Sequence, residues 1–146
     1  MKKVTIIGLL LLGSAYANAD VTRYPLPNNS TFPIAQAVEV SANTTLVYHS
    51  GTLPSPANPD AEQGSREFWG DTEAQANSVF ENMSASLEKL GLDFGDVIKM
   101  TVFLVGDPEL DGRMDFGGFM KAYSKHFGTE AQPNKPARSA IQIAAL

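Results

Sequence analysis

The sequence predicts a single α+β domain in which two helices cover one face of a mixed sheet. A chain of 146 residues, 43% of them hydrophobic, can bury one core but hardly two. Four short segments have the apolar pattern of strands, and two longer ones repeat apolar residues every three or four positions. Their order is strand, strand, helix, strand, helix, strand, so both helices need one sheet face to cover.

The first nineteen residues have the pattern of a secretory signal peptide. Two lysines precede an apolar run at 4–12, and the small residues at 17–19 fit a cleavage site. The run is shorter than the roughly 20 apolar residues that span a bilayer. We therefore expect a mature chain that starts at Asp20, a periplasmic or secreted bacterial protein, and no membrane contact after cleavage. An ordinary N-terminal core helix is the alternative.

Composition disfavours several classes of function. The net charge of −5 becomes more negative when the signal lysines are lost, which disfavours non-specific nucleic-acid binding. Cysteine is absent, so disulfides and thiolate chemistry are not available. The two histidines, His49 and His126, are far apart, and we expect no metal site. The sequence contains no Gly-x-Ser-x-Gly elbow, phosphate loop or dinucleotide fingerprint.

The N-terminal half predicts an arm, a hairpin and a long loop. Residues 21–33 read as an extended arm, because their three prolines block helix and most sheet pairing. Two β-rich segments, about 36–40 and 44–50, predict an antiparallel hairpin. Residues 52–70 are rich in proline and glycine, and we expect this loop to lie over a site or a subunit contact. Phe68 and Trp69 at its end can instead pack on the following helix.

The C-terminal half predicts two helices and two strands. Asp71 or Thr72 can cap a helix that ends at Gly91. Its apolar stripe consists of Ala76, Val79, Phe80, Met83, Leu87 and Leu90. Residues 97–105 are apolar on both faces, which predicts a strand in the middle of a sheet or at an oligomer contact. A second amphipathic helix is expected at about 113–127, and the last strand from Ser139.

Arg138 is the candidate functional residue that the sequence indicates most directly. Pro136 precedes it and a predicted strand follows it, so its guanidinium has a preset direction. Such a fork suits bidentate capture of a planar carboxylate. A surface salt bridge is the alternative. The nearby lysines, Lys121 and Lys125, are expected on the solvated face of the second helix.

The segment KPARSAIQIAAL, residues 135–146, resembles most of the signature of the RidA (YjgF) family. YHSGTLP at 48–54 resembles that family's early Ser-Gly strand end, and residues 70–107 resemble its long helix, glycine-containing turn and central strand. The similarity runs in order from about Phe32 to Leu146. It implies a chorismate-mutase-like α+β fold, a homotrimer with clefts between subunits, and hydrolysis of enamine or imine intermediates without metal or cofactor.

The resemblance also implies a site. Arg138 and Ser50 would be its catalytic residues, with Arg138 anchoring the carboxylate of a small imino or keto acid. Ile34 stands where active members carry a tyrosine, Met120 or a near neighbour where many carry an asparagine, and Ala140 where a cysteine often follows the arginine. The substrate-binding residues would be Arg138, Gly51, Ser139, Ala140, Ile34 and Met120.

Two other functions fit the same resemblance. One is a trimeric module that binds small carboxylates in the cleft without turnover. The other is an endoribonuclease, which the acidic chain and the lack of a histidine pair disfavour. The family's last strand, with a glutamate that helps to hold water, would start just after Leu146. We therefore expect the domain formed by residues 20–146 to stop short of that strand.

Overall fold

The computed structural model describes residues 21–145, so the predicted signal peptide, 1–19, lies outside the described residues. The strands form two ladders: β1 (Val21–Tyr24) pairs antiparallel with β2 (Ala37–Val40), and β3 (Lys99–Val105) pairs parallel with β4 (Ala137–Ile143). A bridge between Ala35 and Ala137 joins the ladders. The helices are α1 (Arg66–Trp69), α2 (Thr72–Lys89) and α3 (Phe116–Tyr123), with 3-10 helices at Phe94–Asp96 and Pro108–Leu110.

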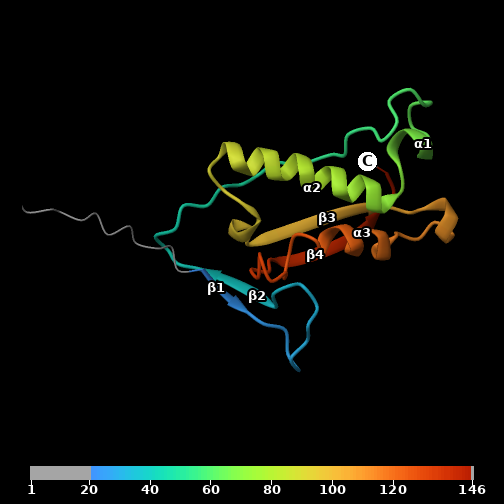
Figure 1. Ribbon diagram of the computed structural model, residues 1–146. Helices are drawn as coiled ribbons and strands as arrows, with labels where there is room; N and C mark the ends of the chain where they lie inside the picture. The colour runs from blue at the N-terminus through green and yellow to red at the C-terminus, as the bar shows by residue number, and fades with distance from the viewer. Residues whose placement is uncertain (1–20, 146) are drawn as a thin grey trace, which may run out of the picture.

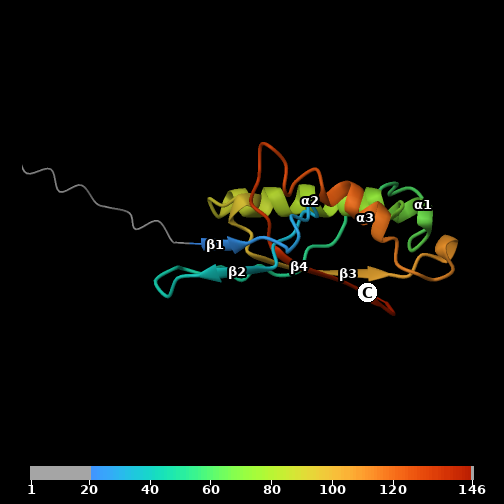
Figure 2. The same cartoon turned by 90° about the horizontal axis from the view of Figure 1, so that it is seen from below.

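The two helices α2 and α3 lie on one face of the β3–β4 ladder, as predicted, but the strands of residues 21–145 form two two-stranded sheets and not the single mixed sheet that the sequence predicted. Figure 2 shows α2 and α3 on the same side of both strands, and no described element covers the other side. Side chains alternate along β3, so Met100, Val102 and Leu104 pack against the helices. The outward face remains apolar and open: Phe103 is 50% exposed, and Val105 and Ile141 are each 43% exposed.

Helix α2 begins and ends where the sequence predicts. The Asp71 side chain accepts the N–H of Ala74 at 2.8 Å, which caps the first turn. Three positions of the predicted stripe, Ala76, Phe80 and Leu87, are buried. Gly91 follows the helix at φ +72°, a conformation that glycine adopts without steric cost. Local signals therefore suffice to place this helix.

The core is a cluster of aromatic rings between α2 and α3. Phe80 from α2 contacts Phe119, Tyr123 and Phe127, with ring centroids 6.1 to 6.4 Å apart. Tyr123 is fully buried, and its hydroxyl donates to the carbonyl of Pro33 at 2.8 Å. Burial of each such ring stabilises the fold by roughly 1.5–3 kcal/mol. This packing holds the N-terminal segment against α3.

The predicted hairpin is wrong in its pairing. Residues 44–50 form no ladder, and β2 pairs instead with β1, in the stretch predicted to be an unpaired arm. Side-chain contacts instead hold residues 49–53 against α2: His49 Nε2 lies 2.8 Å from Ser86 Oγ, and Asn82 donates to the carbonyl of Leu53 at 3.2 Å. Within residues 21–145, β3 pairs on one edge only, so it is not in the middle of a sheet, and the other predicted place for this strand, an oligomer contact, stays a prediction.

Candidate functional site

Strand β4 directs Arg138 toward the helices. In the parallel register Arg138 lies beside Met100, whose side chain packs on the aromatic core. Four rings surround the guanidinium, and we call them the Arg138 cage. The Cζ atom lies 4.2 Å from the ring centre of Tyr123, 5.1 Å from Phe119, 5.5 Å from Phe32 and 5.6 Å from Phe116. All four distances are within the range of cation–π attraction.

The guanidinium is poorly supplied with hydrogen-bond acceptors. Its Nη1 donates to the thioether sulfur of Met120 at 3.0 Å, and a thioether is a weak acceptor. Its Nε is buried without a partner. Within residues 21–145 no carboxylate forms an ion pair with Arg138. Burial lowers the pKa of Arg138, yet a guanidinium stays charged at neutral pH, so the site carries an uncompensated cation.

Tyr123 supports the cation with its ring rather than with its hydroxyl. Burial raises the pKa of Tyr123 to about 12, although the nearby charge of Arg138 acts in the opposite direction. The phenol is therefore neutral at physiological pH, and its proton is donated to Pro33. Tyr123 is not a general base in this arrangement.

Some predicted site residues lie with Arg138 or the aromatic core, and the others lie at exposed positions. Met120 contacts Arg138 directly, and Ile34 and Ala140 pack on the aromatic core beneath it. Ser139 is exposed on the opposite face of β4. Ser50 is also exposed, and with Gly51 it lies in the extended segment before the long loop.

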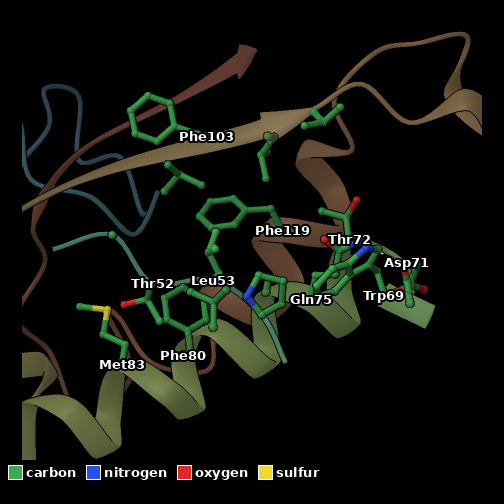
Figure 3. Close-up of a pocket in the computed structure, with 18 of the residues that line it drawn as sticks. Thr52, Leu53, Trp69, Asp71, Thr72, Gln75, Phe80, Met83, Phe103 and Phe119 are labelled. Carbon is green, nitrogen blue, oxygen red and sulfur yellow. Dashed lines mark hydrogen bonds between the residues drawn. The ribbon is translucent and has the colours of Figure 1, made fainter. Parts of the chain in front are cut away.

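A cavity of about 980 Å³ lies between residues 49–54, the inner face of α2 and β3 (Figure 3). Ser50 and Gly51 belong to its lining, whereas Arg138 does not. Phe119 lines the cavity and also belongs to the Arg138 cage, so the two places share this ring. One chain alone therefore does not bring the predicted catalytic residues, Arg138 and Ser50, together.

Both ends of the 52–70 loop line the cavity. An ion pair that no sequence pattern indicated holds the C-terminal end of this loop. Arg66 Nη1 donates to both carboxylate oxygens of Asp107 at 2.9 Å, and Asp107 is only 8% exposed. Hydrogen bonds from Arg66 hold the pKa of Asp107 below its usual value, and the N–H of Glu109 adds a further one. The two residues are 41 positions apart, so no local pattern could indicate the pair.

Residues 21–145 contain no group of three or more histidines, aspartates and glutamates that could hold a metal ion. In the same part of the chain, no helix combines the length and apolar character needed to cross a membrane. The arrangement at Arg138 can bind an anion, but it presents no acid or base of its own.

A sequence model of the family described as "Endoribonuclease L-PSP" matches residues 28–146. The chain belongs to this family, the RidA (YjgF) family. A "RutC family protein" of Haemophilus influenzae is 36% identical to it over 114 residues, which cover 78% of this chain and 76% of the relative. A protein of Escherichia coli, "Putative reactive intermediate deaminase TdcF", is 33% identical over 114 residues, with the same coverage of 78% and 76%.

A solved structure supports the fold. The protein YyfB of Yersinia pestis, described as a member of the "Conserved Rid Protein Family", superposes with a TM-score of 0.59 and 21% sequence identity. The match covers 85% of this chain and 86% of that protein. The α+β fold of the RidA family, predicted from the sequence, is confirmed.

Proposed function

We propose that this RidA-family protein is a cofactor-independent hydrolytic deaminase of enamine or imine intermediates. Arg138 anchors the substrate carboxylate. The observation that carries the proposal is the state of this guanidinium, which is half-buried, bonded to a thioether and unpaired with any described carboxylate. A carboxylate that replaced the sulfur would gain charge-assisted hydrogen bonds that Met120 cannot supply.

The hydrolysis requires mainly that the protein position the imine carbon and the attacking water relative to each other. Water adds to the imine carbon next to the anchored carboxylate, the C–N bond breaks, and ammonia and a 2-keto acid leave. Holding the carboxylate fixes the electrophilic carbon relative to the attacking water, which is the main contribution to rate. Ser50 would reach this carbon from a neighbouring subunit, because within one chain it lies apart from Arg138.

Assembly into a homotrimer is part of the proposal. The face of β3 and β4 away from the helices is apolar, with Phe103, Val105 and Ile141 between 43% and 50% exposed. A cluster of this kind on an uncovered sheet favours contact with another subunit. Clefts between subunits would then join the Arg138 cage of one chain to residues 50–51 of the next.

A non-catalytic carboxylate-binding module is the second candidate. It is favoured by the lack of a titratable acid or base in the cage, where Tyr123 is neutral. The endoribonuclease activity in the family description is less favoured. His126 packs between Phe80 and Phe94, with ring centroids 4.9 Å apart in both pairs, and His49 bonds to Ser86, so the histidines form no catalytic pair.

Export is proposed on the sequence alone. The pattern of residues 1–19 is that of a signal peptide, so the mature protein would begin at Asp20 in the periplasm or outside the cell. N-terminal sequencing of the fractionated protein decides this. A cytoplasmic product that starts at Met1 would contradict it.

The deaminase proposal is tested by generating 2-iminobutanoate or 2-iminopropanoate with an amino-acid oxidase and following its loss. The deaminase should accelerate release of ammonia and 2-keto acid above the rate in buffer. If the protein leaves the rate unchanged but binds 2-ketobutanoate in calorimetry, the binding module replaces the deaminase.

A further inference from the structure

Phe32 and Phe116 form the accessible side of the Arg138 cage. The other two rings are part of the core, with Phe119 3% and Tyr123 0% exposed. Phe32 is 38% exposed and Phe116 is half-buried. These two rings stack with an interplanar angle of 21° and centroids 6.4 Å apart. A ligand that reaches the guanidinium from solvent therefore contacts an aromatic surface.

Within residues 21–145 the guanidinium contacts four aromatic rings and one thioether, and none of these is a strong hydrogen-bond partner for a polar substituent. The thioether of Met120 lies beside the guanidinium. The apolar side chain of Ile34 packs on the aromatic core to which Phe119 and Tyr123 belong. A ligand with a short polar body would lose hydration here without gaining hydrogen bonds. A ligand with a flat apolar body would instead bury its surface on Phe32 and Phe116, with the ring contacts that aromatic pairs favour.

We infer that the Arg138 site selects carboxylates with an aromatic body, the 2-imino and 2-keto acids of aromatic amino acids, over three- and four-carbon acids. Phe32 and Phe116 are its specificity-determining residues. The identity of the substrate rests on the proposed deaminase function, whereas the binding preference does not require turnover. An additional aromatic contact is worth about a tenfold gain in affinity at most.

The test compares phenylpyruvate with pyruvate by calorimetry, since both share the 2-keto acid group. The wild-type protein should bind phenylpyruvate about tenfold more tightly. Phe32→Ala and Phe116→Ala should each remove most of this preference and change pyruvate binding by no more than about twofold. Tyr48→Ala is the matched control, because Tyr48 is 91% exposed and lies outside the cage. Phe116→Leu replaces Phe116→Ala if the latter unfolds.

Three results overturn the inference: pyruvate binding that equals or exceeds that of phenylpyruvate, a preference that survives in the double variant, or binding of neither acid. A second arm separates it from the deaminase proposal. The imines made from phenylalanine and 2-aminobutyrate by an amino-acid oxidase are compared for turnover. Turnover of the small imine alone sinks the inference and leaves the deaminase standing. Tighter binding of phenylpyruvate without turnover of either imine supports the binding preference and contradicts the deaminase proposal.

Discussion

The guanidinium carbon of Arg138 lies 4.2 Å from the centre of the Tyr123 ring. That ring is fully buried, and its hydroxyl donates to Pro33, the residue that follows Phe32. One tyrosine therefore supports the cation with its face and positions the N-terminal side of the cage with its hydroxyl.

Replacing Tyr123 with phenylalanine should separate these two roles. The ring remains under the guanidinium, but the buried carbonyl of Pro33 loses its donor, so the free energy of unfolding should fall by about 1 kcal/mol. Denaturant titration measures this loss. Tyr48→Phe is the control, because Tyr48 is 91% exposed. A loss for Tyr123→Phe that is no greater than the control's would show that the Pro33 contact does not stabilise the fold.

The ion pair of Arg66 and Asp107 should make stability depend on acid pH. Arg66 lowers the pKa of Asp107 in the folded state, so the carboxylate's contribution is fully present above its unfolded pKa of about 3.9. It is lost as the pH falls through the lower, folded pKa. Asp107→Asn should lower the Tm at pH 7, and the difference from wild type should shrink below about pH 4. Asp111→Asn, at a 95% exposed carboxylate, should leave the Tm almost unchanged.

His126 should weaken the fold as the pH falls through the range of histidine titration. Burial against Phe80 and Phe94 lowers its pKa, Lys125 adds to this, and Glu81 opposes it. Its neutral form thus stabilises the fold above the unfolded pKa of about 6.5, and this contribution is lost as the pH falls through the lower, folded value. His126→Gln should flatten the unfolding free energy between about pH 7 and 5. An unchanged pH slope would contradict this, and His49→Gln provides the comparison.

The uncovered sheet face should control assembly. Phe103 is half exposed and lies beside Ile141 in the ladder, so Phe103→Glu would place a charge in the proposed subunit contact. Light scattering should show a trimer for the wild type and a monomer for the variant. Leu90→Glu, at a 54% exposed side chain at the end of α2 and outside that face, should remain a trimer. A wild-type monomer at micromolar concentration would contradict the trimer and the cleft between subunits.

The sequence predicts those elements whose signals are local. Helix α2 has its cap, stripe and glycine stop within about twenty consecutive positions, and the structure confirms it. The 44–50 segment has an equally good β pattern, but it forms no ladder, and His49 and the following Leu53 bond to side chains of α2 instead. Pairing depends on such distant partners, and a strand pattern does not contain them.

The candidate site was only partly predictable for the same reason. The sequence indicated Arg138 and its contact residue Met120, because a strand and a proline flank the arginine and the family resemblance named the methionine. The rings of the cage come from residues 32 and 116–123, which the fold brings to β4. No spacing in the chain relates them, so their enclosure of the guanidinium appears only in three dimensions.

Benzoate binding by Arg138 variants tests the central claim, that Arg138 anchors a carboxylate, most directly. Arg138→Ala should lose about 2–4 kcal/mol of binding free energy, and Arg138→Lys should recover little, because an ammonium cannot reproduce the bidentate fork. Arg113→Ala, at a 78% exposed arginine, is the control and should bind as the wild type does. If Arg138→Ala keeps its fold in circular dichroism and binds benzoate as tightly as the wild type, Arg138 is not the anchor.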